Sequence, residues 1–279
     1  MKKLLTGIFI LFLLSANYSE AQEKKLTIKD AVIGQWTSLY PEYIDQLQWI
    51  PETNQYIYAE EDNLIRGTVK NEKSEKLLSL DEINQIAQFS EEKQLKSLPR
   101  VQWLNKDILT FRHQNTYYKI NPFDKILIDT LSFPLDAQNQ DYSHENNHFA
   151  YTINNNLFIA SFDGVHSQIT NEDKRDIVYG QEVHRREFGI HTGTFWSPEG
   201  KKLAFYRKDE SMVTDYPLVD VTKRIAELEN IKYPMAGMSS HHVTLGVYDM
   251  STEKITYLKT GKPLEQYLTC VTWGPEGNY

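Results

Sequence analysis

The residues best suited to chemistry lie in a charged loop in the second half of the chain. Its sequence, VHRREFGI (183–190), places the carboxylate of Glu187 among arginine, glycine and aromatic residues, and Glu182 lies just before it. Such an irregular, charged loop is costly unless it binds something. A carboxylate in a partly dehydrated cavity binds a cationic amine by a charge-assisted hydrogen bond, worth about 1.5–3 kcal/mol. The alternative for both residues is a solvated surface charge, as for most glutamates.

The chain does not supply the groups for covalent catalysis. It contains no G-x-S-x-G motif, and histidines without such a serine do not form a triad. The single cysteine, Cys270, lies in the pattern LTCVTW (268–273), which predicts a buried residue on a strand rather than a nucleophile. His241 and His242 would point to opposite faces of a strand and so would not share an ion. We therefore expect no catalytic residue, no metal site and no cofactor.

The N-terminus predicts export. Lys2 and Lys3 precede an apolar run over residues 4–16, and small or polar residues follow up to Ala21. This pattern is typical of a cleaved signal peptide over residues 1–21. An uncleaved anchor is the alternative, but the run is shorter than the about 20 residues that a membrane span requires. We expect a periplasmic or secreted protein that lacks internal disulfides, because one cysteine cannot form one.

Aromatic anchors recur along the rest of the chain and predict an all-β fold. They are Trp49, Trp103, Phe149, Trp196 and Trp273. The first four are 46–54 residues apart, close to the roughly 40–50 residues of a four-stranded propeller blade. A β-sandwich is the alternative, but it would not explain this period. We predict a partial β-propeller of four-stranded blades.

Two further elements are predicted outside the repeat. Thr27 is a suitable N-cap for a short N-terminal helix. The last anchor spacing is longer than the others, and the extra residues lie between 209 and 243. They include a helix-like stretch, 221–228, and insertions of this size often lie on the binding face of a repeat fold. The formal net charge of −8 argues against nucleic acid as a partner.

Three segments resemble one protein family. They are DIVYGQEVHRREFGIHTGTFWSPEGKKLAFYRKDESMVTDYPL (176–218), KYPMAG (232–237) and VTLGVYD (243–249). Together they resemble the N-terminal propeller of the dipeptidyl peptidase IV family, a group of prolyl oligopeptidase-type serine peptidases. The earlier repeats match by pattern only.

The resemblance implies an eight-bladed propeller followed by a C-terminal α/β-hydrolase domain with a Ser-Asp-His triad. Such an enzyme removes N-terminal dipeptides, usually with proline or alanine in second place. Residues 22–279 would then be part of the propeller, and the hydrolase domain would lie beyond them. Because the chain stops just after a turn that should open another strand, we expect it to be the N-terminal part of a longer protein, inactive alone.

The resemblance also assigns candidate binding residues. In the family, a Glu-rich segment before an aromatic strand binds the substrate's α-amino group. Glu187 takes that place here, although Arg186 stands where the first of two adjacent acids is usual, and Glu182 is the second candidate. Arg112, in Phe-Arg-His, resembles a family arginine that approaches the substrate carbonyl; the alternative is an exposed hairpin arginine.

The leading functional interpretation is therefore the substrate-gating propeller of an exported dipeptidyl peptidase. Its partners would be a peptide N-terminus and its own hydrolase domain, and a homodimer is a further candidate assembly. One alternative is a non-catalytic propeller that binds protein or glycan. Another is the propeller of a prolyl oligopeptidase-type endopeptidase, which would not need an amine-binding carboxylate.

Overall fold

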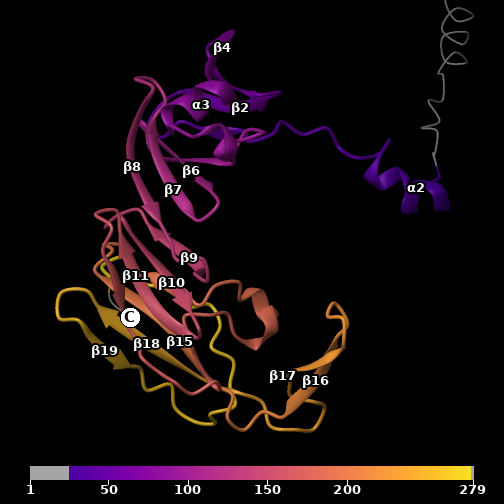
Figure 1. The fold of residues 1–279 in the computed structure, drawn as a ribbon, viewed down its shortest axis with the longest axis vertical. Helices are drawn as coiled ribbons and strands as arrows, with labels where there is room; N and C mark the ends of the chain where they lie inside the picture. The colour runs from indigo at the N-terminus through magenta and orange to yellow at the C-terminus, as the bar shows by residue number, and fades with distance from the viewer. Residues whose placement is uncertain (1–24, 278–279) are drawn as a thin grey trace, which may run out of the picture. The chain divides into compact units, whose positions relative to one another are not determined.

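The computed structural model describes residues 25–277, without the side chains of residues 71–72. The chain divides into a small unit that ends at Ile44 and a larger unit that begins at Asp45 (Figure 1). The predicted signal peptide lies outside the described residues. Among the residues described, no helix is long and apolar enough to span a membrane.

The small unit contains the predicted N-terminal helix. It comprises α2 (Ile28–Val32) and the 3-10 turn η1 (Gly34–Trp36). The Thr27 hydroxyl accepts a hydrogen bond from the Asp30 amide at 3.1 Å, and the Asp30 carboxylate accepts one from the Thr27 amide at 2.9 Å. This reciprocal capping box satisfies two amides that the first helical turn cannot pair, so the predicted N-cap is confirmed.

The larger unit consists mainly of four antiparallel sheets, one after another along the chain (Figure 1). In the first three, each strand pairs with the next strand in sequence, as in a propeller blade. The first sheet comprises β1 (Gln48–Trp49), β2 (Gln55–Glu60), β3 (Asn63–Thr68) and β4 (Asn71–Ser79). The second comprises β5 (Val101–Asn105), β6 (Ile108–His113), β7 (Thr116–Asn121) and β8 (Ile126–Ser132). The third comprises β9 (Gln138–Ser143), β10 (His148–Ile153), β11 (Asn156–Ser161) and β12 (His166–Gln168).

The fourth sheet is assembled from more distant segments. It comprises β13 (Ile177–Tyr179), β14 (Thr194–Trp196), β15 (Lys202–Asp209), β18 (His242–Asp249) and β19 (Lys254–Tyr257). Two short helical segments, α3 (Leu80–Ile86) and η2 (Glu91–Lys93), connect the first two sheets. The prediction of an all-β partial propeller is confirmed.

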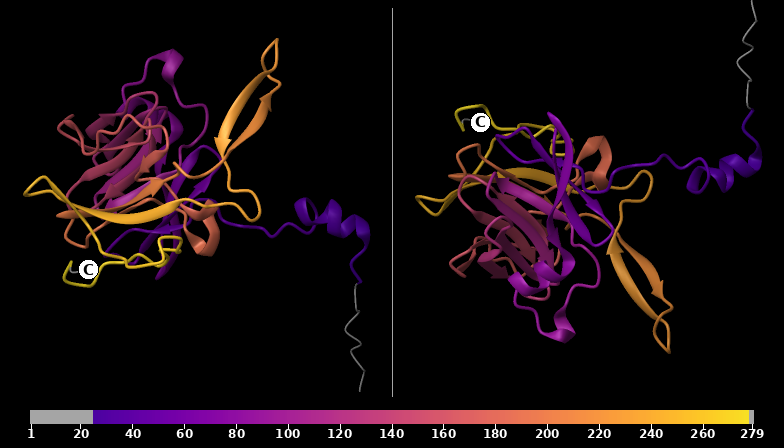
Figure 2. Two further views of the ribbon diagram at one scale, coloured as in Figure 1. Left: turned by 90° about the horizontal axis from the view of Figure 1, so that it is seen from below. Right: turned by 90° about the horizontal axis from the view of Figure 1, so that it is seen from above.

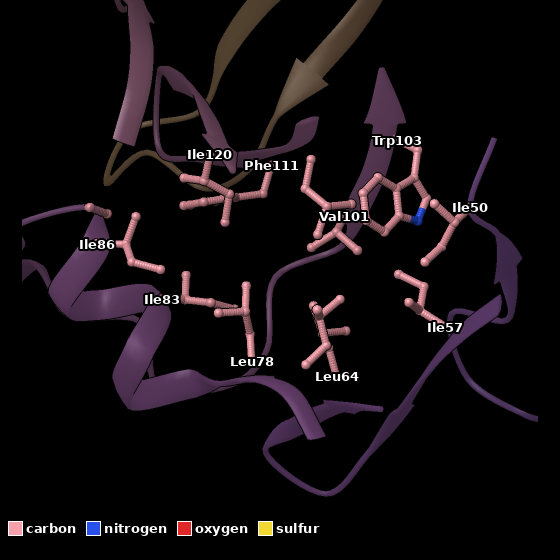
Figure 3. Packing of buried hydrophobic residues seen from close by; sticks show 13 residues of the cluster. Ile50, Ile57, Leu64, Leu78, Ile83, Ile86, Val101, Trp103, Phe111 and Ile120 are labelled. Atoms are coloured by element: carbon pink, nitrogen blue, oxygen red, sulfur yellow. The ribbon is translucent and has the colours of Figure 1, made fainter. Parts of the chain in front are cut away.

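The sheets bury their faces against one another. Ile57, Leu64 and Leu78 of the first sheet pack with Phe111 and Ile120 of the second in one cluster (Figure 3). A single twisted sheet of four strands cannot cover both of its own faces, so stacking is what removes these side chains from water. Burial of such a side chain contributes about 1.5–3 kcal/mol.

The predicted anchors also connect neighbouring sheets through hydrogen bonds. The indole N–H of Trp196 donates to the Asp141 carbonyl at 3.2 Å, and that of Trp273 donates to the Phe195 carbonyl at 2.9 Å. Between the first two sheets, the side-chain amide of Gln48 donates to the Val101 carbonyl at 2.9 Å. The indole contact is confined to these two anchors: within the described residues, the buried Nε1 of Trp103 has no hydrogen-bond partner.

The structure corrects two predictions from the sequence. The stretch 221–228 is not helical. It forms the turn between β16 (Asp215–Asp220) and β17 (Glu227–Lys232) and the first two residues of β17. These two strands make a hairpin that projects from the sheets (Figure 2). The paired strands satisfy the backbone and override a weak local helix preference. Cys270 is exposed rather than buried in a strand, and its φ of 54° breaks the predicted alternation.

One interruption in the fourth sheet creates the loop that carries Glu187. Both β13 and β14 pair with β15, on either side of Tyr206. The Gly180 amide donates to the Tyr206 carbonyl at 2.9 Å, and the Tyr206 amide donates to the Gly193 carbonyl at 3.0 Å. Residues 181–192 therefore leave the sheet and return to it at one residue of the ladder, so this segment is an insertion in the blade.

Gly193 allows the two ends of the loop to approach closely. A Cβ atom at this position would lie 2.3–2.4 Å from backbone atoms of Gln181, a separation that real Cβ atoms do not show. Backbone cannot move aside as a flexible side chain can. Glycine is therefore required here by close approach.

We predict that Gly193→Ala opens the loop and lowers the unfolding free energy by about 2–3 kcal/mol, the upper part of the range for overpacking. Hydrogen exchange at the Gly180 and Tyr206 amides should accelerate. Gly164→Ala is the comparison variant without a steric clash: no atom lies within 4 Å of the place that a Cβ would take, and its φ of 81°, which Gly193 does not share, tests backbone strain alone. Unchanged exchange in Gly193→Ala would contradict the role given to this glycine.

Candidate functional site

The loop between Gly180 and Gly193 is irregular and strained. Its 3-10 segment η3 (His184–Gly189) contains three non-glycine residues in the left-handed region after His184: Arg185, Arg186 and Phe188, with φ of 53°, 65° and 54°. Each such residue costs on the order of 1–2 kcal/mol, and such strain persists only where the surroundings hold it. The prediction of an irregular, costly loop is confirmed.

Two apolar residues hold the ends of the loop in place. Val183 and Ile190 are buried in a small cluster with Tyr206 and Val243, and Leu268 packs against the same cluster. Between them, His184 is buried and residues 185–189 are exposed. The cluster thus offsets the strain and presents the charged part of the loop.

The loop lines a pocket of about 640 Å³. The other walls come from the end of β15, the segment after β17, the residues before β18 and the segment that follows β19. The lining residues are Gln181, Glu182, Val183, His184, Arg185, Arg186, Glu187, Lys208, Glu210, Lys232, Tyr233, Pro234, Ser240, His241 and Tyr267.

The two predicted glutamates both line this pocket but differ in their partners. The Glu182 carboxylate accepts a hydrogen bond from Nε of Arg186 at 2.6 Å and so forms an ion pair. The exposed Glu187 carboxylate accepts one from the neutral hydroxyl of Tyr267 at 2.9 Å. Among residues 25–277, no cationic side chain forms an ion pair with Glu187. Of the two glutamates, Glu187 is the one without a cationic partner among these residues.

Two buried histidines pack together at this site: His184 belongs to the loop, and His241 precedes β18. The His184 ring lies 4.2 Å from the Tyr267 ring and 4.8 Å from the His241 ring, centroid to centroid. Burial lowers the pKa of His184 and lowers that of His241 to about 4, so both are neutral near pH 7. Within the described part of the chain, the buried Nε2 of His184 has no hydrogen-bond partner. Neither ring therefore supplies a cation that would compete for Glu187.

Arg112 lies outside this pocket. It is exposed on β6 and lines a separate cavity of about 670 Å³ with residues of the first two sheets, including Gln46 and Arg100. Its guanidinium donates to the Gln114 carbonyl at 2.9 Å and to the Gln140 side chain at 3.1 Å. The structure does not bring Arg112 together with the glutamates, and its contact with a substrate carbonyl stays a prediction.

The sequence did not single out Tyr267 as a site residue. It lies 80 positions after Glu187 in a segment that forms no strand among the described residues, so no local pattern linked the two. The sequence pointed to His241 only as a metal ligand, an interpretation that was set aside. The described residues include no group of three His, Cys, Asp or Glu placed to hold a metal ion.

Comparison with known proteins identifies the family. The family described as "Dipeptidyl peptidase IV (DPP IV) N-terminal region" matches residues 98–279. The chain belongs to this family. The matched residues include the loop, its pocket and the second, third and fourth sheets of the dipeptidyl peptidase IV N-terminal region.

Individual sequences named as dipeptidyl-aminopeptidases are also similar to part of this chain. A probable dipeptidyl-aminopeptidase B from Pyrenophora tritici-repentis is 33% identical over 145 residues, which are 44% of this chain and 16% of that protein. One from Talaromyces stipitatus is 30% identical over 149 residues, 45% of this chain and 16% of that protein. The matched part of the chain thus spans less than a fifth of these curated relatives.

Solved structures of the family share the fold. The crystal structure of a putative dipeptidyl aminopeptidase IV from Bacteroides ovatus superimposes with a TM-score of 0.76 and 37% identity, over 91% of this chain and 35% of that one. Porphyromonas gingivalis dipeptidyl peptidase 4 gives a TM-score of 0.60 at 18% identity, over 88% of this chain and 36% of that one. The second match supports the fold alone.

The depressed histidine pKa predicts a pH-dependent stability. The unfolded state binds a proton at His241 near pH 6.5 and the folded state only near pH 4, so stability should fall as pH falls through this window. Between pH 7 and pH 5 we expect a loss of about 1–2 kcal/mol from this residue. His241→Gln should reduce this loss, measured by chemical denaturation at both pH values. His242→Gln controls for removal of one imidazole, and equal pH dependence in all three proteins would contradict the assignment.

Proposed function

We propose that this chain is the substrate-gating propeller part of an exported serine dipeptidyl peptidase that releases X-Pro or X-Ala dipeptides. Glu187 binds the α-amino group of the substrate. The observation that carries the proposal is the Glu187 carboxylate, which lines the pocket with a hydroxyl rather than a cation as its partner. Family membership supports the reaction class.

The charge distribution suits an amine ligand. Glu182 holds Arg186 in an ion pair at 2.6 Å, which leaves that guanidinium engaged away from Glu187. The two buried histidines are neutral near pH 7. A substrate ammonium group would therefore meet a carboxylate that has no cationic partner among the described residues. A charge-assisted hydrogen bond between the two contributes about 1.5–3 kcal/mol.

Amine binding also explains why cleavage would occur after the second residue of the substrate. If the ammonium group is fixed on Glu187, the distance from there to a nucleophile decides which peptide bond is cut. The serine nucleophile and its triad would belong to a hydrolase domain beyond these residues. The propeller part would thus select the substrate and set its register, and the hydrolase domain would cleave it.

Arg112 receives a separate role in this proposal. It lines another cavity and holds the Gln140 side chain rather than any residue of the Glu187 loop. A guanidinium can donate two hydrogen bonds to peptide oxygens. We propose that the Arg112 guanidinium donates to a carbonyl of the bound peptide substrate.

We predict that Glu187→Gln in the full-length protein lowers kcat/KM for H-Ala-Pro-p-nitroanilide by about tenfold or more, because a charged hydrogen bond is lost. Glu199→Gln is the matched control, since Glu199 is paired with Lys201 in a surface turn and should retain wild-type kinetics. Activity is measured by steady-state release of p-nitroaniline.

Two outcomes would contradict the assignment, and a third would favour another class of protein. Unchanged kinetics in Glu187→Gln together with a large loss in Glu182→Gln would transfer amine binding to Glu182. Efficient cleavage of N-acetylated peptides by the full-length protein would indicate an endopeptidase without amine recognition. Absence of any peptidase activity in the full-length protein would favour a propeller that only binds protein or glycan.

A further inference from the structure

We infer that Tyr267 is a positioning residue that holds the Glu187 carboxylate in its amine-binding orientation. This inference rests on the proposed function of Glu187. The Tyr267 hydroxyl donates a hydrogen bond to Oε2 of Glu187 at 2.9 Å, across 80 positions of sequence. Among the described residues, no group is hydrogen-bonded to the second carboxylate oxygen, Oε1, so this oxygen is open to a ligand.

The ring of Tyr267 is 52% exposed and is supported by ring contacts on its other side. It lies 4.2 Å from the His184 ring at an interplanar angle of 35°, and His184 lies 4.8 Å from His241 at 32°. Phe188 packs edge-on against Tyr267 at 5.1 Å and 78°. These contacts form a column of rings from the residue before β18, through the loop, to Tyr267. Because two members of the column are buried histidines, the ring has a rigid support.

The backbone of Tyr267 is fixed by the same residue that closes the loop. Its neighbour Leu268 accepts a hydrogen bond from the Tyr206 hydroxyl at 2.6 Å, through its carbonyl. The main-chain groups of Tyr206 hold Gly180 and Gly193 at the two ends of the loop. Tyr206 thus holds both the loop that carries Glu187 and the segment that carries Tyr267, which limits changes in the distance between these two side chains.

The chemistry of the pair suits positioning rather than proton transfer. The hydrogen bond to Glu187 raises the pKa of Tyr267, so the phenol remains a donor across the neutral range. Without that donor, the glutamate side chain would have to lose its rotational freedom when the substrate binds. Ordering a flexible side chain weakens binding by about three- to tenfold. The loss should appear in KM, because the pair does not touch the bond that is cut.

Tyr267→Phe in the full-length protein tests this inference, because it removes the hydroxyl and keeps the ring in the column. With H-Ala-Pro-p-nitroanilide, we expect KM to rise about three- to tenfold and kcat to stay within about twofold. Tyr216→Phe is the matched control: Tyr216 lies on β16 outside the pocket lining and should retain the wild-type KM. A KM for Tyr267→Phe equal to that of the wild type would overturn the inference.

A double variant separates positioning from a general structural effect. If Tyr267 acts through Glu187, then Glu187→Gln/Tyr267→Phe should be no worse than Glu187→Gln alone. Fully multiplicative losses would overturn the positioning role. If Glu187→Gln lowers kcat/KM but Tyr267→Phe changes nothing, only the inference fails. If Glu187→Gln itself changes nothing, the proposed function fails and the positioning role fails with it.

Discussion

The candidate site depends on Tyr206, a buried residue in the middle of β15. Its amide and carbonyl groups bond to Gly193 and Gly180, so the edge of the sheet beside β15 can stop after β13, form a loop and resume as β14. Its ring packs with the apolar ends of the loop, and its hydroxyl holds the Leu268 carbonyl. Three kinds of interaction at one residue therefore fix both the loop and the segment that packs on it. The candidate site is thus carried by a loop whose two ends are held in a blade.

The charges of the loop are divided so that one carboxylate stays available. Arg186 pairs with Glu182, while Glu187 meets only a hydroxyl within the described residues. Burial keeps His184 and His241 uncharged near pH 7, so their rings act as packing surfaces. Of the two arginines before Glu187, Arg186 pairs with Glu182 and Arg185 lies over the Tyr233 ring.

Local and periodic features of the fold were predictable from sequence. Aromatic anchors indicated the blades because four of them lie in the strands β1, β5, β10 and β14, one in each sheet, and Trp196 and Trp273 each donate an indole hydrogen bond to a backbone carbonyl. The stretch 221–228 was predicted wrongly because strand pairing across the hairpin, a nonlocal interaction, outweighs local helix preference. The pocket was half predictable: both glutamates line it, whereas Tyr267 reaches it only through tertiary packing that no periodicity encodes.

The central claim is that the Glu187 carboxylate binds the amino group of a peptide. A crystal structure of the full-length protein with a bound product dipeptide tests it most directly. The account predicts the dipeptide nitrogen at about 2.7–2.9 Å from a Glu187 oxygen, the usual length of a charge-assisted hydrogen bond. Arg186 should remain on Glu182. A dipeptide whose amino group lies on Glu182, or in the cavity beside Arg112 with no contact to Glu187, would contradict the account.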